Sequence, residues 1–273
     1  MLLRDFFFSI KNVHISFLEK GQIVKLFKVG DRVAHASMPI GAYSEKQIMP
    51  EEKLVSVPDD VSDEVASCVT LKGITAEYLL HRAYPLKKGD KVLYHAAAGA
   101  LGQILCPWAN SIGAEIIGTV GSKKKEEIAK KNGCHHVINY TDKNFVEEVE
   151  KIVGKNGIDV VYDGVGLKTF EGSIEVLKIR GMMVAFGNAS GYVDTIDVKK
   201  HINAKGLFFT RPSIAHYTIE REELLESAKK VFDAVLSGKF KIDISKKYSL
   251  DEVKQAHEDL EGRLLTGPAV IKP

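Results

Sequence analysis

The sequence predicts an α/β protein in which a doubly wound parallel sheet is inserted into a β-rich domain built from both ends of the chain. Short apolar runs alternate with amphipathic, charged stretches across residues 91–210, as strands and helices do in such a sheet. A turn of small residues joins the first of these runs to a helical pattern. The flanking segments are different, because their short runs are broken by glycine and proline.

Five apolar runs in the central region predict buried parallel strands. They are rich in valine and isoleucine, and several end in glycine or aspartate. The runs cover residues 91–96, 114–120, 135–140, 158–166 and 182–187. Between them, residues 123–133 form a helical pattern that we expect to end at Gly133, and residues 144–157 repeat the pattern with one apolar face.

The flanking segments predict the second domain. Residues 21–58 read as small antiparallel β structure, and residues 219–237 as a long amphipathic helix. Residues 241–249 read as a strand, after which Ser249 and Glu252 form a capping box that opens another helix. The chain closes with the strand pattern PAVIKP. We therefore expect one domain from residues 1–74 and 213–273, and a second from residues 75–212.

Composition and charge limit the classes of function. The 273 residues are 45% hydrophobic and 27% charged, which is typical of a soluble globular protein, and the net charge of +2 is too small to indicate nucleic-acid binding. The three cysteines, Cys68, Cys106 and Cys134, lie far apart without metal-ligand spacing, which favours reduced thiols. No apolar run approaches the about 20 residues of a membrane span, and Asp5 interrupts the aromatic N-terminal run. We expect a cytoplasmic protein with no membrane partner.

The turn HAAAGALGQ, residues 95–103, has two of the three glycines of a dinucleotide-binding loop, with Ala97 in place of the first. A turn of small residues that only lets a helix pack on a strand is the alternative. The cofactor interpretation is favoured because the turn follows a predicted strand directly and opens an apolar helix, the setting of a Rossmann-type fingerprint. Gly99 permits close approach to a pyrophosphate, and the helix N-terminus supplies N–H groups.

The end of the next predicted strand indicates which dinucleotide is bound. NAD-binding folds usually carry an acidic residue here for the ribose 2′-hydroxyl, but this strand ends GTVGSKKK. Ser122, Lys123, Lys124 and Lys125 offer a hydroxyl and positive charge where a 2′-phosphate would sit. A solvated helix start is the alternative, but three lysines in a first turn oppose the helix dipole and a phosphate would compensate. The sequence therefore favours NADPH.

The chain resembles the quinone oxidoreductases, the zeta-crystallin-like, zinc-free branch of the medium-chain dehydrogenase/reductase superfamily. The motifs that carry the resemblance are HAAAGALG, IIGTVGS, HVINY, VVYDGVG, MVAFGNASG and FFTRPS, and it extends over roughly residues 27–273. It implies that the β-rich domain is GroES-like. It also implies cofactor-binding roles at sixteen positions. These are Thr75, Tyr78, Gly99, Ala100, Leu101, Gly102, Gly121, Ser122, Lys125, Tyr140, Phe186, Gly187, Asn188, Phe209, Thr210 and Arg263.

The sequence also departs from the family. Residues 1–26 do not match the opening strands of the catalytic barrel, so we expect that domain to be incomplete. Gly164 stands where the family usually has serine. The Gly-His-Glu segment, catalytic cysteine and four-cysteine lobe of the zinc-dependent relatives do not occur, so we expect no metal. No acid–base residue can be named from the sequence.

The resemblance implies NADPH-dependent reduction of a small quinone by a homodimer, paired through the last strand of the sheet at GLFFTRPS. Two alternatives stay open. The first alternative is a reductase of conjugated enones or alkenals. The second is a degraded family member that binds NADPH, RNA or a protein partner without catalysis.

Overall fold

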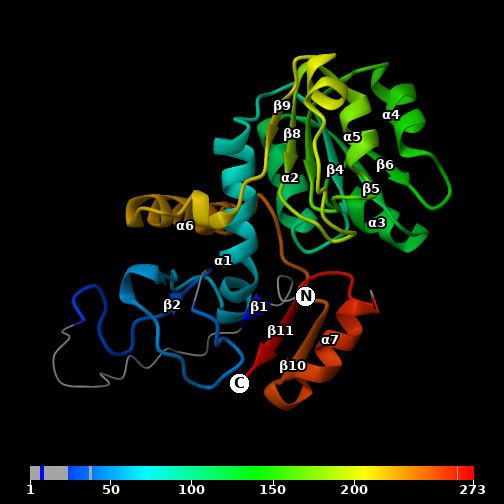
Figure 1. Ribbon diagram of the computed structural model, residues 1–273. Coiled ribbons are helices and arrows are strands. Elements are labelled where there is room, and N and C mark those ends of the chain that lie inside the picture. Colours follow the sequence, from blue (N-terminus) through cyan, green and yellow to red (C-terminus); the bar gives the residue numbers. More distant parts are fainter. Residues whose placement is uncertain (1–6, 9–23, 37–38, 263) are drawn as a thin grey trace. The chain divides into compact units, whose positions relative to one another are not determined.

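The computed structural model describes residues 7–8, 24–36, 39–262 and 264–273 (Figure 1). Contacts between residues divide the chain into two compact units, Met1–Ile74 with Ala215–Pro273, and Thr75–Ile214. The long helix α1, Asp63–Tyr78, ends in the second unit. The expected mismatch of residues 1–26 lies mostly outside the described residues.

The second unit is built on a six-stranded parallel sheet with the order β6-β5-β4-β7-β8-β9. Its strands are β4 (Lys91–His95), β5 (Glu115–Val120), β6 (His136–Asn139), β7 (Ile158–Asp163), β8 (Leu177–Ala185) and β9 (Phe208–Thr210). All six residues of β7 are buried, because this strand is covered on both faces. The parallel, doubly wound sheet predicted from the sequence is confirmed.

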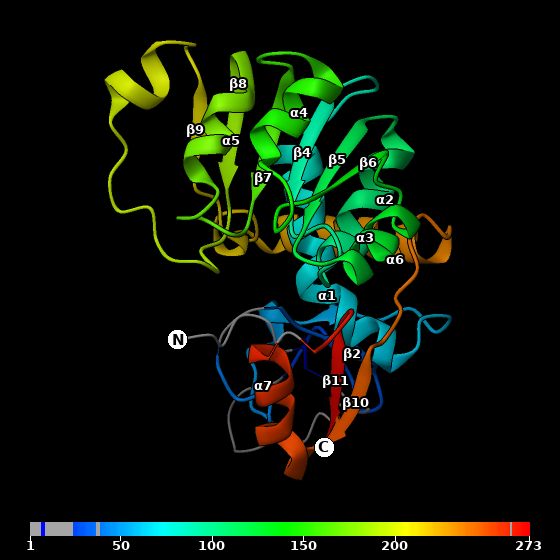
Figure 2. The same cartoon turned by 90° about the vertical axis from the view of Figure 1, so that its right-hand side faces the viewer.

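Four helices connect these strands and cover the sheet. They are α2 (Gly102–Ile112), α3 (Lys123–Lys131), α4 (Phe145–Val153) and α5 (Phe170–Val176). The chain runs outward from β4 to β6 through α2 and α3, and then crosses back to β7 and β8 through α4 and α5. Right-handed crossovers therefore place the two pairs of helices on opposite faces (Figure 2). The strand order reverses beside β4, where ligands bind in open α/β sheets.

Among its described residues, the first unit contains two small sheets and two α-helices besides the start of α1. The parallel sheet β1-β11-β10 comprises Phe7–Phe8, Ala269–Lys272 and Lys246–Ser249, and the antiparallel pair β2-β3 comprises Val33–Ala34 and Val55–Ser56. The helices are α6 (Arg221–Leu236) and α7 (Val253–Glu261). A Cβ at Gly73 of α1 would lie 2.4 Å from Cγ1 of Val231 in α6, so this glycine lets the two helices approach closely.

Short helical turns link these elements. They are the 3₁₀ turns Glu51–Lys53, Ile214–His216 and Leu250–Glu252 and the π turns Leu79–Ala83 and Val198–Asn203. The predicted capping box is present, because Ser249 and Glu252 exchange hydrogen bonds before α7.

Several boundaries differ from the sequence predictions; the strand expected over residues 182–187 is β8, which begins earlier, at Leu177. The strand expected over residues 241–249 is formed only by Lys246–Ser249, because its partner β11 begins after Pro268, which has no N–H to continue the ladder. The strand expected over residues 158–166 ends at Asp163, whose carboxylate accepts hydrogen bonds from the N–H groups of Val165 and Gly166. The last residue of α3 is Lys131, and Gly133 stops the helix as predicted, with a left-handed φ of 85° and an N–H that donates to the carbonyl of Lys130 at 3.0 Å.

Candidate dinucleotide-binding site

The loop after β4 is shaped by two close backbone contacts. Ala96 has a positive φ of 62°, and the N–H of Gly99 donates to its carbonyl at 2.9 Å. A Cβ at Gly102 would lie 2.2 Å from the carbonyl oxygen of Ala97. Because that neighbour is backbone, it cannot move aside as a flexible side chain would, and only glycine fits where α2 begins.

The first turn of α2 suits an anion. The helix begins without a side-chain cap at Leu101 and has no acidic residue in its first turn. Ala96 and Gly99 are exposed, and Ala100 and Leu101 are half-buried. The N-terminal end of a helix with this loop presents N–H groups and a positive dipole to a phosphate.

Expected cofactor residues also meet at the carboxyl ends of β5 and β6. A Cβ at Gly121 would lie 2.5 Å from the hydroxyl oxygen of Tyr140, so the tyrosine lies against this glycine. Ser122 is the N-cap residue of α3, yet its hydroxyl does not bond to the first turn. Lys125 is half-buried in the first turn of the helix, while Lys123 and Lys124 are exposed. A hydroxyl, a phenol and a cation thus follow the carboxyl ends of β5 and β6, and groups of this kind suit a 2′-phosphate.

The loops after β7 and β8 are packed together. A Cβ at Gly187 would lie 2.3 Å from the carbonyl oxygen of Gly164, and a Cβ at Gly164 would lie 2.9 Å from Cζ of Phe186. The ring of Phe186 is stacked on Tyr94, with centroids 6.4 Å apart and planes 9° apart. Gly164 therefore leaves room for this ring. A serine at this position, as the family usually has, would add a Cβ that crowds Phe186 as well as a hydroxyl.

The remaining expected residues lie in different settings. Phe209 and Thr210 are half-buried in β9, and Phe209 packs edge-on against Phe170 with centroids 6.3 Å apart. Tyr78 is only 2% exposed and Thr75 is half-buried, both on α1. Arg263 lies outside the described residues.

Most of the expected set therefore lies along one edge of one sheet. Parallel strands bring their carboxyl ends to the same edge, and the loops after β4, β5, β6, β7 and β8 all contribute there. Asp163, His95 and Ser173 also organise this edge, and sequence reasoning did not identify them. The only signal for them was Asp163, which lies within the fourth apolar run.

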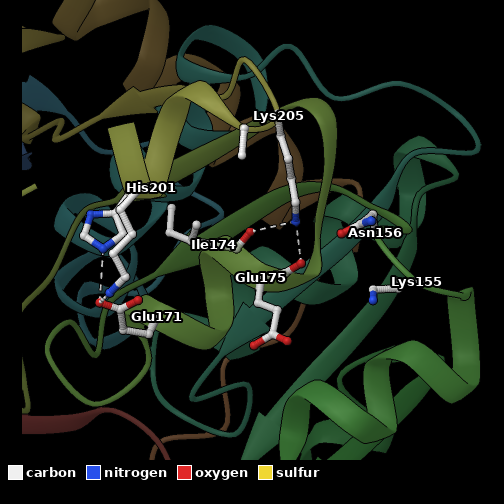
Figure 3. Close-up of a pocket in the computed structure, with 9 residues that line it drawn as sticks. Lys155, Asn156, Glu171, Ile174, Glu175, His201 and Lys205 are labelled. Carbon is white, nitrogen blue, oxygen red and sulfur yellow. Dashed lines mark hydrogen bonds and ion pairs between the residues drawn. The ribbon is translucent and has the colours of Figure 1, made fainter. Parts of the chain in front are cut away.

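A separate polar pocket of about 380 Å³ lies near the amino ends of β7 and β8 (Figure 3). The Glu171 carboxylate accepts from Nζ of Lys200 at 2.8 Å and lies 3.1 Å from Nε2 of His201. The Lys205 ammonium donates to the carbonyls of Glu175 and Leu177 at the end of α5. These ion pairs and hydrogen bonds join the segment after β8 to α5.

Electrostatics in this pocket follow from those contacts. The hydrogen bond from Lys200 lowers the pKa of Glu171, with a smaller contribution from His201. Burial lowers the pKa of Lys205, and the nearby Glu175 carboxylate opposes that shift.

Among the residues that the structure describes, no three His, Cys, Asp or Glu side chains gather where they could hold a metal ion. Nor does any helix in that part of the chain have the length and apolar character to cross a membrane.

The parallel sheet and its small-residue loop define a dinucleotide-binding domain of the dehydrogenase class. A family profile described as zinc-binding dehydrogenase matches residues 100–236. The chain is 45% identical over 258 residues to a 2-haloacrylate reductase from Burkholderia sp., covering 93% of this chain and 78% of the relative. It is 42% identical over 256 residues to quinone oxidoreductase 1 of Escherichia coli, with the same coverage.

Solved structures give the same result. The crystal structure of E. coli quinone oxidoreductase complexed with NADPH matches with a TM-score of 0.88 and 42% identity, over 92% of this chain and 77% of that one. The crystal structure of 2-haloacrylate reductase matches with a TM-score of 0.87 and 44% identity, over 93% and 80%. The chain belongs to the quinone oxidoreductase family of the medium-chain dehydrogenase/reductase superfamily.

Proposed function

We propose that this chain is an NADPH-dependent reductase of small quinones. The observation that carries the proposal is the loop between β4 and α2, where the backbone of Ala97 excludes any Cβ at position 102 and the helix starts without a side-chain cap. Relatives at 40–42% identity are named quinone oxidoreductases, and one of their crystal structures is a complex with NADPH. Both support the proposal.

The proposed roles follow the positions of the residues along the sheet edge. Gly99, Ala100, Leu101 and Gly102 would hold the pyrophosphate. Gly121, Ser122, Lys125 and Tyr140 would hold the adenosine ribose and its 2′-phosphate. Phe186, Gly187 and Asn188 would lie beside the nicotinamide. The same proposal includes the outlying positions Thr75, Tyr78, Phe209, Thr210 and Arg263.

NADPH, when bound, supplies a hydride to the substrate. The chain's own residues would bind and orient the cofactor: the helix N-termini would face the phosphates, and Phe186, whose ring is stacked on Tyr94, would lie beside the nicotinamide. We propose no metal in this reaction and no catalytic acid–base residue from the chain.

A reductase of conjugated, electron-poor double bonds is the second candidate function. The relative at 45% identity is named 2-haloacrylate reductase, which favours this class over unrelated hydride acceptors. A third candidate is a cofactor-binding protein without catalysis, which would follow if the catalytic domain, residues 1–74 and 213–273, is incomplete. Residues 75–212 form the cofactor-binding domain in all three cases.

The purified chain saturated with NADPH should be mixed separately with 1,4-benzoquinone, 2-chloroacrylate and but-3-en-2-one. Loss of NADPH absorbance is the measurement, with a protein-free sample as control for direct reduction. We expect the fastest protein-dependent oxidation with the quinone. Faster oxidation with 2-chloroacrylate or the enone would favour the second candidate. Binding of NADPH with no oxidation by any acceptor would favour the third.

We further propose a cytoplasmic homodimer paired through β9. This strand lies at the end of the sheet order, and Phe208 on it is 59% exposed. The three cysteines are buried and free, which agrees with a reducing compartment.

A further inference from the structure

Four polar side chains are buried together beneath the carboxyl edge of the sheet. His95 ends β4, Thr119 lies on β5, Asp163 ends β7 and Ser173 lies on α5. None is more than 1% exposed. Burying such groups costs free energy unless each has a hydrogen-bond partner, so the way in which they pair defines a specific arrangement.

The hydrogen bonds of this cluster have a definite direction. Nδ1 of His95 lies 2.9 Å from Oγ1 of Thr119, and Nε2 of His95 lies 2.9 Å from Oγ of Ser173. The single hydroxyl proton of Ser173 points toward acceptors, the carbonyl of Thr169 at 2.8 Å and Oδ2 of Asp163 at 3.4 Å. The arrangement that satisfies all of these groups has Ser173 donating to these acceptors, Nε2 of His95 donating to Ser173, and Nδ1 of the neutral ring accepting from Thr119. Burial lowers the pKa of His95, which agrees with this neutral imidazole.

At one end of the cluster, Asp163 builds the loops on the nicotinamide side. Its Oδ1 accepts from the N–H groups of Val165 at 2.7 Å and Gly166 at 2.9 Å. Its main-chain carbonyl accepts from the N–H groups of Phe186 at 2.9 Å and Gly187 at 3.2 Å. One residue thus holds both the turn after β7 and the turn after β8.

At the other end, His95 is the last residue before the pyrophosphate loop. The next residue, Ala96, has the positive φ that starts the loop, and the N–H of Ala97 donates to the carbonyl of Thr119 at 3.0 Å. The ring of Phe145 packs edge-on against the imidazole, with centroids 5.1 Å apart, and so fixes its plane. The imidazole therefore links the start of the loop to α5, and through Ser173 to Asp163.

We propose that His95 is a positioning residue for NADPH, which acts through Ser173 to hold the pyrophosphate loop in register with the loops built by Asp163. Both halves of the cofactor then meet a preformed surface, which reduces the ordering cost of binding. This inference rests on the proposed function. His95 acts through the loop rather than by contact, because its side chain is buried.

The test compares two substitutions of His95, one that keeps a polar atom near Nδ1 and one that keeps a polar atom near Nε2. His95→Asn places a polar atom near the former Nδ1 and loses the bond to Ser173, whereas His95→Gln can reach toward Ser173. We expect His95→Asn and Ser173→Ala each to raise the Kd for NADPH about tenfold, as loss of one buried hydrogen bond would. We expect His95→Gln to raise it less, and the double variant His95→Asn/Ser173→Ala no more than either single change.

A second ligand distinguishes positioning from general loosening. Adenosine 2′-monophosphate reaches only the ends of β5 and β6, so its Kd should stay unchanged in the same variants. Tyr162→Phe is the matched control, because its buried hydroxyl donates to the carbonyl of Leu79 at 3.0 Å from the opposite face of β7. This change should lower thermal stability without altering either Kd.

Calorimetric titration of folded protein gives both dissociation constants. Unchanged NADPH affinity in His95→Asn and Ser173→Ala would overturn the inference while leaving the proposed function standing. Equal losses for NADPH and adenosine 2′-monophosphate would also overturn it, since they would indicate general loosening. If the unaltered chain does not bind NADPH, the proposed function fails, and the inference fails with it.

Discussion

At the scale of single residues, the buried imidazole of His95 makes stability depend on pH. Burial lowers its pKa, an effect that the Asp163 carboxylate opposes, so the ring is neutral in the folded chain at pH 7. In the unfolded chain its pKa returns to about 6.5. The stability that it contributes is therefore fully present above pH 6.5 and is lost as the pH falls below that value toward the folded pKa.

Comparison with His95→Gln isolates this effect. The advantage of the unaltered chain over the variant should shrink by about 1 kcal/mol between pH 7.5 and pH 5.5, because protons bind the unfolded imidazole first. The measurement is denaturant unfolding followed by the fluorescence of the single tryptophan, Trp108, which is buried in α2. A constant difference across this range would contradict a neutral buried His95.

What the sequence could predict at this scale was local. Gly99 and Gly102 were identified because they lie within one loop, and Ser122 and Lys125 because they follow one strand. The bond from His95 to Ser173 joins residues 78 positions apart, and no local pattern reports such a pair. The room that Gly164 leaves for Phe186 likewise depends on a strand that comes later in the chain.

At the scale of elements, the long apolar runs gave reliable predictions. Most residues of β4, β5 and β7 are buried because both faces of these strands are covered, and this burial accounts for their apolar runs. In β8 burial is concentrated in the second half, and the predicted run began there, at residue 182. Strand β10 was predicted too long, because its length is set by Pro268 on its partner rather than by its own sequence. Strand ends depend on pairing, which periodicity alone does not contain.

The edge strand β9 carries a prediction about assembly. An exposed edge with Phe208 on it is a template for pairing, and a charge placed there should block it. We expect sedimentation velocity to give about twice the chain mass of 30.1 kDa for the unaltered protein and the chain mass for Phe208→Lys. The exposed residue Tyr192 provides the control, since Tyr192→Lys changes charge equally without touching β9. Identical masses for the unaltered protein and Phe208→Lys would contradict pairing through this edge.

At the scale of the whole molecule, the second unit has the parts that a dinucleotide site needs. A glycine loop, an uncapped helix start and a serine–lysine–tyrosine group meet at one sheet edge, and a buried polar cluster supports that edge. The first unit has smaller sheets and smaller buried apolar clusters among its described residues. The sequence analysis expected intact cofactor motifs and an incomplete catalytic domain; the unmatched opening strands lie mostly outside the described residues, so that second expectation stays a prediction.

The most direct test of the cofactor site is titration of the purified chain with NADPH and NADH, followed by nicotinamide fluorescence. We expect saturable binding that prefers NADPH, and a loss of that preference in Lys125→Glu, because the 2′-phosphate would meet a negative charge. Lys143→Glu, an exposed change outside the proposed site, should leave the preference intact. Absence of binding by either dinucleotide would contradict the central claim, and the loop after β4 would then only connect a strand to a helix.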